Sequence, residues 1–99
     1  MDLTDRQRRY LRKFTHPLKP VIMIGDAGLT DNVASETDRA LRDHELIKVK
    51  VRAADRDDRD RMVEELARRT GSALVQRVGH VAVLYRRNAE NPKLVIPDE

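Results

Sequence analysis

The first part of the chain has the hydrophobic spacing of a helix. Thr4-Asp5-Arg6-Gln7 has the form of a capping box, which predicts that a helix begins there. A stripe at the spacing i, i+3, i+4 and i+7 follows, and it comprises Gln7, Tyr10, Leu11 and Phe14. The remaining arc is basic and comprises Arg6, Arg8, Arg9, Arg12 and Lys13. Pro17 and Pro20 end the helix, because proline has no N–H donor and restricts the residue before it.

The next apolar run leads into a glycine turn. Residues 21–24 are all apolar, which favours a strand buried on both faces. Gly25 and Gly28 bracket a tight turn, and Thr30 is a good N-cap for a second helix. The inward stripe of that helix is expected to comprise Val33, Thr37, Ala40, Leu41 and His44. Free backbone N–H groups and a helix dipole would then meet at the turn, an arrangement that favours an anion.

Residues 46–52 switch to the period-two pattern of a half-buried strand. The inner row consists of Ile47, Val49 and Val51, and the outer row is entirely basic, with Lys48, Lys50 and Arg52. Such a row can be the solvent side of a strand that discourages edge pairing. Three like charges at alternate positions repel one another, however, and an anion lying across them would relieve that repulsion. We therefore favour contact of this row with phosphate.

A third helix and a hairpin complete the pattern. Asp55 suits the N-cap of this helix and Gly71 its C-terminal stop. Its inward positions are Met62, Val63, Leu66 and Ala67. Residues 73–78 and 81–86 are predicted to be strands joined by Gly79-His80, the form of a two-residue hairpin turn.

The predicted order of elements is therefore α-β-α-β-α-β-β. Its two β-α-β crossovers imply right-handed connections and at least one parallel pair of strands. We predict a single α/β domain, α+β-like with two layers, around a four-stranded mixed sheet. The domain spans residues 1–87, and a polar tail with two prolines follows over residues 88–99. Within this tail Leu94-Val95-Ile96 has the composition of a short edge strand.

Composition narrows the classes of protein. The 99 residues suffice for one modest core, and the absence of cysteine leaves neither a disulfide framework nor a thiolate metal site. No apolar run approaches the roughly 18 residues that a membrane helix needs, and the charged N-terminus lacks the apolar region of a secretory signal. We expect a soluble, cytoplasmic, monomeric protein.

Charge is segregated along the chain. Residues 1–19 contain six basic and two acidic side chains, whereas residues 30–45 contain two basic and five acidic ones. The net charges are therefore +4 and −3. Such segregation favours an oriented electrostatic partner. A solvated surface of mixed charge explains the same counts equally well.

No residues combine into a catalytic or cofactor site. His16, His44 and His80 lack metal-ligand spacing, and neither Ser35 nor Ser72 lies in a nucleophile motif. The glycine turn lacks the lysine of a P-loop and the longer dinucleotide fingerprint. We expect no enzymatic activity, no metal, no cofactor and no small-molecule substrate.

The Gly-x-x-Gly turn gains meaning from its context. Many strand-to-helix turns use glycine for positive φ alone, but the KH module clamps nucleic-acid backbone with a loop of this form. Tyr10 and Phe14 belong to the first helix and Tyr85 to a strand, so the sheet lacks the paired aromatics with which other RNA-binding modules stack bases. Nucleic-acid binding should therefore be electrostatic, with little base stacking.

The order of these motifs resembles the bacterial YhbY proteins, stand-alone versions of the CRM domain (chloroplast RNA splicing and ribosome maturation). The resemblance covers about residues 3–87. It rests on Leu3-Thr4 with Gln7, His16-Pro17-Leu18-Lys19-Pro20-Val21, Ile24-Gly25-x-x-Gly28-Leu29-Thr30, His44-Glu45-Leu46-Ile47-Lys48-Val49-Lys50, Gly79 and Leu84-Tyr85-Arg86.

This resemblance implies a fold similar to the C-terminal domain of translation initiation factor three, RNA binding, and association with precursors of the large ribosomal subunit. It implies that Gly25, Asp26, Ala27 and Gly28 contact RNA. The family commonly has basic or polar residues at the middle positions, so Asp26 and Ala27 depart from it. Either backbone N–H groups and neighbouring cations outweigh the charge of Asp26, or the loop binds RNA weakly.

The full set of expected RNA contacts adds basic residues to the glycine loop. They are Arg9, Arg12, Lys13, Lys19, Lys48, Lys50 and Arg52. An alternative function is a protein-interaction module that docks on a ribosomal protein or assembly factor through the acidic second helix.

Overall fold

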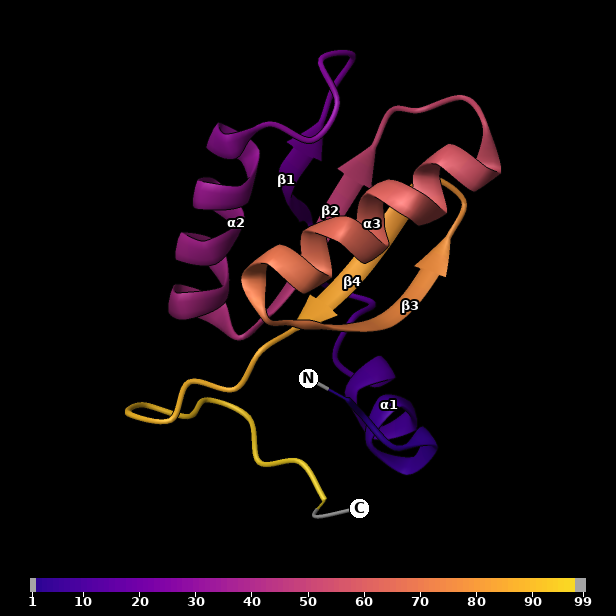
Figure 1. The fold of residues 1–99 in the computed structure, drawn as a ribbon. Coiled ribbons are helices and arrows are strands. Elements are labelled where there is room, and N and C mark those ends of the chain that lie inside the picture. The colour runs from indigo at the N-terminus through magenta and orange to yellow at the C-terminus, as the bar shows by residue number, and fades with distance from the viewer. Residues whose placement is uncertain (1, 98–99) are drawn as a thin grey trace.

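Three helices and four strands follow one another in the predicted order (Figure 1). The computed structural model describes residues 2–97. The elements are α1 (Asp5–Arg12), β1 (Pro20–Ile24), α2 (Asp31–His44), β2 (Leu46–Val51), α3 (Arg56–Thr70), β3 (Ala73–Val78) and β4 (Val81–Tyr85). The sheet order is β1-β2-β4-β3, with β1 parallel to β2 and the other two pairs antiparallel. The predicted four-stranded mixed sheet is confirmed.

Side chains that cap the helices explain where they begin. The capping box of α1 is complete: the Thr4 hydroxyl accepts from the Gln7 N–H, and the Gln7 side chain accepts from the Thr4 N–H. Thr30 and Asp55 cap α2 and α3 in the same general way. α3 ends at Gly71, whose φ of +64° is the left-handed conformation that glycine adopts without strain.

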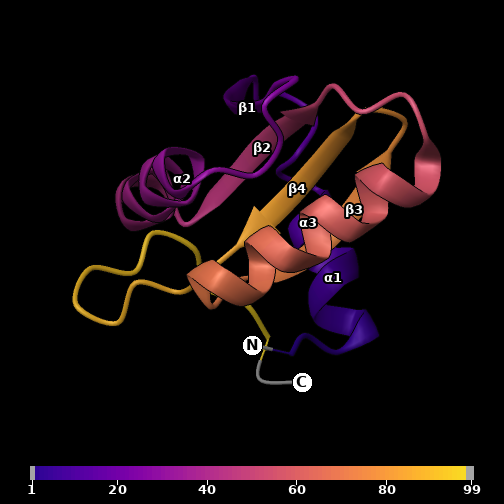
Figure 2. The same ribbon diagram turned by 45° about the horizontal axis from the view of Figure 1, so that its top comes forward.

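The sheet has apolar side chains packed on both faces. α2 and α3 lie on one face of the sheet, and α1 lies on the other (Figures 1 and 2). The larger cluster lies under α2 and α3 and includes Ile24, Leu41, Val49, Leu66 and Leu84. Each such side chain stabilises the fold by about 1.5–3 kcal/mol when fully buried. A smaller cluster lies between the sheet and α1, and includes Leu3, Leu11, Leu46, Val75 and Tyr85.

Two predictions of burial near the N-terminus are wrong. β1 is not buried on both faces, since Val21 is 53% exposed and Met23 52% exposed, while Ile22 and Ile24 are buried. The reason is that β1 is an edge strand and the eight-residue α1 covers only the other end of that face. α1 also ends at Arg12, so Phe14 falls in the following turn and is 38% exposed.

Two charged or polar side chains also differ from expectation. Arg8 is not part of a free basic arc, because its guanidinium donates to the backbone carbonyls of Leu74 and Leu3, each at 3.0 Å. It therefore fastens α1 to the sheet. His44, expected on the inward stripe of α2, is exposed at the C-terminal end of the helix, where a basic side chain suits the helix dipole.

Residues 98 and 99 lie outside the described residues. The described part of the tail does not form the suggested edge strand at Leu94–Ile96, and hydrogen bonds to Glu45 hold it instead. The Glu45 carboxylate is fully buried and accepts the N–H groups of Asn88 at 2.6 Å, Lys93 at 2.6 Å and Leu94 at 2.8 Å. Leu94 consequently packs against the smaller cluster. The N–H groups of the tail thus donate to the Glu45 carboxylate instead of to the backbone of a neighbouring strand.

Replacing Glu45 with Gln should release this tail. The amide of Gln has one oxygen instead of two, so one of the two acceptor positions at residue 45 becomes an NH₂ donor. At least one backbone N–H of the tail then has no acceptor. We expect Glu45→Gln to lower the free energy of unfolding by about 1–3 kcal/mol in urea titrations. The single amide oxygen can accept from Lys93 and Leu94 or from Asn88, so at least one of these three amides should exchange hydrogen faster. Glu36→Gln, at an exposed site on α2, is the matched control. Wild-type exchange at all three amides in Glu45→Gln would contradict the role of this carboxylate.

Candidate nucleic-acid interface

The glycine loop is a closed turn that projects from one end of the molecule (Figure 1). The Gly28 N–H donates to the Gly25 carbonyl at 3.0 Å, which leaves Asp26 and Ala27 exposed at the tip. Only Gly28 has a positive φ, +77°, so a side chain there would be strained. A Cβ at Gly25 would meet nothing within 4 Å. Gly25 is thus dispensable for folding on steric grounds, whereas Gly28 is required by backbone conformation.

The helix N-terminus behind this loop is already partly satisfied. The Thr30 hydroxyl accepts from the Val33 N–H at 3.1 Å, and Asp31 places a negative charge in the first turn of α2. The N–H of Gly28 is used within the turn. Among the described residues, the N–H groups of Asp26 and Ala27 make no hydrogen bond. Of the anion-binding site predicted for this junction, only the N–H groups at the tip of the loop therefore remain as free donors among the described residues.

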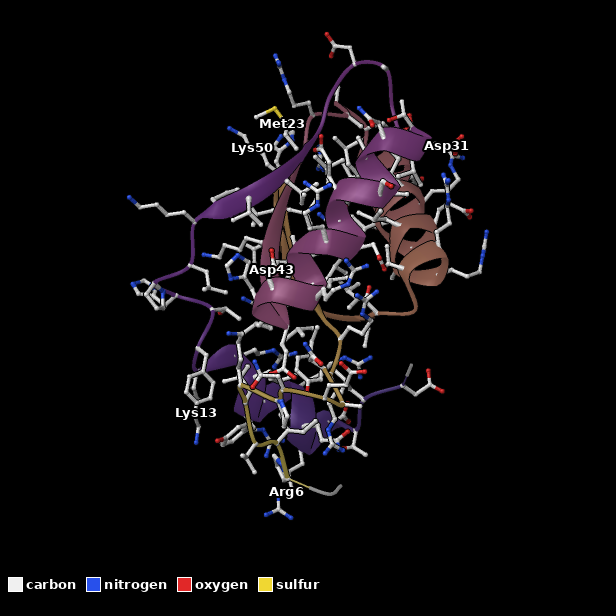
Figure 3. The ribbon with its side chains drawn as sticks, turned by 90° about the vertical axis from the view of Figure 1, so that its left-hand side faces the viewer. Arg6, Lys13, Met23, Asp31, Asp43 and Lys50 are labelled. Atoms are coloured by element: carbon white, nitrogen blue, oxygen red, sulfur yellow. The ribbon has the colours of Figure 1, made fainter. Side chains whose placement is uncertain are left out.

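The open part of the sheet carries the predicted basic row. Lys48 and Lys50 project from β2 on the face opposite α2 and α3, beyond the reach of α1. In the sheet register Lys50 lies between Met23 of β1 and Val81 of β4, and Lys48 lies beside Val83. Figure 3 shows Met23 and Lys50 side by side, on the side of the molecule away from Asp31. No acidic side chain occurs in these rows of the sheet.

Arg52 joins this row to the loop. It is exposed directly after β2, and its N–H donates to the Ile24 carbonyl at 2.9 Å, one residue before Gly25. At the other end, Lys19 is exposed just before β1 and lies near Lys48 along one groove. Lys19, Lys48, Lys50 and Arg52 therefore line one face between the α1 end of the molecule and the glycine loop, and we call them the basic track.

The α1 residues of the predicted site lie elsewhere. Arg9, Arg12 and Lys13 are exposed, but α1 is at the end of the molecule opposite the glycine loop (Figure 1). Figure 3 shows Lys13 at that lower end, on the same side as Lys50. The Lys13 ammonium also lies 5.6 Å from the centre of the Tyr10 ring, a cation–π contact. These residues can extend the basic track away from the loop, but they do not surround the loop.

Lysine and arginine are used differently in this chain. Every ion pair among residues 2–97 takes its cation from an arginine. None of the five lysines is paired with a carboxylate of that part of the chain; they are Lys13, Lys19, Lys48, Lys50 and Lys93. Four of the seven arginine pairs in the described chain join residues three or four positions apart in one helix. The other three join segments that are far apart along the chain, and sequence spacing does not reveal those. The unpaired ammoniums are available to an external anion.

The acids of α2 are mostly engaged within the protein. Asp31 pairs with Arg69 at 2.6 Å, and Asp38 pairs with Arg86 at 2.5 Å and Arg42 at 2.8 Å. The hydrogen bond from Arg86 lowers the pKa of Asp38 below its usual 3.8, together with the charges of both arginines. Glu45 is buried. Of the five acids counted from the sequence, Asp38 and Glu45 are thus held within the protein, whereas Asp31, although ion-paired, keeps a side chain that is 99% exposed.

Other kinds of site find no support in the described part of the chain. Residues 2–97 contain no group of three or more histidine, aspartate or glutamate side chains placed to hold a metal ion. None of the helices there has the length and apolar character to span a membrane.

Comparison with known proteins gives a consistent picture. The family model described as CRS1 / YhbY (CRM) domain matches residues 3–86. The chain is 45% identical over 93 residues to "Probable RNA-binding protein PA4753" of Pseudomonas aeruginosa, covering 94% of this chain and 89% of that protein. It is 43% identical over 95 residues to a Haemophilus influenzae protein named "RNA-binding protein", covering 96% and 95%. The solution structure of SAV1595 from Staphylococcus aureus, described as a candidate RNA-binding protein, superposes with a TM-score of 0.85 at 38% identity, covering 97% of this chain and all of that one.

Proposed function

This chain belongs to the CRS1/YhbY (CRM) domain family, and we propose that it is a non-catalytic protein that binds the phosphate backbone of RNA. Relatives named as RNA-binding proteins support this class of partner. The observation that carries the proposal is the basic track: lysines without carboxylate partners among residues 2–97 lie on the part of the sheet that no helix covers. RNA phosphates would pair with these lysines, which have no carboxylate partner among residues 2–97.

The loop and the track would act together. Backbone N–H groups at Asp26 and Ala27 donate to one phosphate, as the loop of a KH module does. The carboxylate of Asp26 repels that phosphate, so Arg52 and Lys50 supply the compensating charge. Affinity then comes mainly from the track, and the loop fixes where the backbone enters it.

We further propose that the RNA belongs to precursors of the large ribosomal subunit and that the protein acts in the cytoplasm as a monomer. The resemblance of its motifs to YhbY proteins is the basis for this choice of RNA. Epitope-tagged protein in a cell lysate should therefore sediment with free large-subunit particles on a sucrose gradient, and nuclease treatment should release it. Sedimentation that survives removal of RNA would instead indicate docking on a protein.

Reversing two charges of the track should abolish most RNA binding. Lys48→Glu with Lys50→Glu removes two phosphate contacts and introduces two repulsions, so affinity for a ribosomal RNA hairpin at low salt should fall on the order of 100-fold. The matched control is Arg39→Glu with Arg56→Glu, which makes the same change in net charge at exposed positions of α2 and α3. Filter binding measures affinity and thermal unfolding verifies the fold. Equal losses in both double variants would show that only net charge matters.

The loop contact can be isolated at Gly25. Gly25→Ala adds a methyl group to open space, so stability should stay unchanged while close approach of a phosphate is blocked. We expect about a tenfold loss of affinity for the same hairpin, the equivalent of one charge-assisted hydrogen bond of about 1.5 kcal/mol. Gly28→Ala is the comparison for strain, and it should cost about 1 kcal/mol of stability. Wild-type affinity in Gly25→Ala would remove the loop from the interface.

A further inference from the structure

An open apolar groove lies at the α1 end of the basic track. It has a volume of about 410 Å³, within the range of about 300–1,000 Å³ that is typical for small-molecule sites. Its apolar walls include Phe14 from the turn after α1, Val21 from β1 and Leu94 from the tail. The groove therefore gathers side chains from three segments that are far apart in the sequence.

Three lysines also line this groove, and no acid does. Lys19, Lys48 and Lys93 come from the chain before β1, from β2 and from the tail, and none is paired with a carboxylate of the described chain. Three unpaired ammoniums beside an apolar wall are complementary to a ligand that is flat and apolar at one end and multiply anionic at the other. A nucleotide within a nucleic-acid strand has this character, because its base is a planar ring and phosphates flank it on both sides.

We propose that this groove receives one unstacked base of the bound RNA. This deepens the proposed function and rests on it. The base lies against the Phe14 ring, and the flanking phosphates contact Lys19 and Lys48. Lys48 belongs to both the groove and the basic track, so the strand can continue from this base along β2 to the glycine loop.

The geometry around Phe14 supports a stacking role. Phe14 is 38% exposed, although it is one of only three aromatic residues in the chain. The Phe14 ring packs edge-on against the Tyr10 ring, at 5.3 Å between ring centres and 60° between planes. β1 is an edge strand, so one side of its backbone also has N–H and C=O groups without a sheet partner, which can meet the polar edge of a base. The proposed base site differs at this one position from the sequence-based expectation of little base stacking.

The first test uses nucleotides alone and the whole chain. In NMR titrations the adenosine, guanosine, cytidine and uridine 5′-monophosphates are compared with ribose 5-phosphate, which has no base, and with N-acetylphenylalanine amide, which mimics a protein side chain. At least one nucleotide should shift the resonances of the Phe14 ring and the Val21 methyl groups, whereas ribose 5-phosphate, which can contact only the lysines of the groove, should shift them less. Equal shifts with ribose 5-phosphate, or a response to the phenylalanine probe alone, would overturn the proposal.

The second test uses RNA with one unpaired nucleotide next to a short duplex. Replacing that nucleotide with an abasic one should weaken binding by at least about fivefold, the lower end of what one base–aromatic stack contributes. Phe14→Leu should lose the same factor and no longer distinguish the two RNAs, while Phe14→Tyr should retain the distinction. Val78→Ala, at an exposed apolar site outside the groove lining, is the matched control and should bind both RNAs as the wild type does.

The failures of the two proposals can be told apart. If Phe14→Leu binds both RNAs as the wild type does, while charge reversal of Lys48 and Lys50 abolishes binding, the base site is wrong and backbone binding stands. If wild-type protein binds no RNA, the nucleotide titrations still decide whether the groove accepts a base.

Discussion

Glu45 occupies the junction between α2 and β2, where its carboxylate is buried and accepts three backbone N–H groups of the tail. Its own carbonyl accepts the N–H of Arg86 at 2.9 Å, just after β4. Its φ of +64° turns the chain sharply from the helix into the strand. A buried carboxylate is costly unless it is hydrogen-bonded, and here the tail supplies the bonds. The same hydrogen bonds hold Lys93 and Leu94 of the tail beside the apolar groove at the α1 end of the basic track. Glu45 therefore positions both the start of β2 and one wall of that groove.

The second constraint is the shortness of α1. With eight residues it covers only one end of the sheet face that lies opposite α2 and α3, and Val21, Met23 and Val78 remain more than half exposed. Exposed apolar side chains next to unpaired lysines mark an interaction surface more clearly than charge alone. Arg69, Arg77 and Arg86 join α2, α3 and the strands to one another through ion pairs with Asp31, Asp60 and Asp38. This use suits the planar, multidentate guanidinium. Lysines, each a mobile point charge, are left for the open side.

Much of the fold could be predicted because its signals are local. The capping box at Thr4, the period-two pattern of β2 and the Gly79-His80 turn each depend on residues close in sequence. The errors concern contacts between distant segments. The apolar run of β1 could not reveal that β1 is an edge strand, and Arg8 could not be separated from its basic neighbours without the carbonyl of Leu74. Likewise the sequence named most residues of the candidate interface, but not that α1 and the glycine loop lie at opposite ends, nor that the tail completes a groove at Phe14.

We propose that unpaired cations along one face bind RNA phosphates. Each phosphate neutralised releases condensed counterions, so the logarithm of the affinity falls linearly with the logarithm of the salt concentration, by about 0.7–0.9 per contact. The four residues of the basic track predict a slope of about −2.8 to −3.6 for the wild-type protein on a ribosomal RNA hairpin. Binding isotherms measured across a range of potassium chloride concentrations give this slope directly. A slope near zero would contradict the claim, because affinity would then come from contacts that displace no counterions.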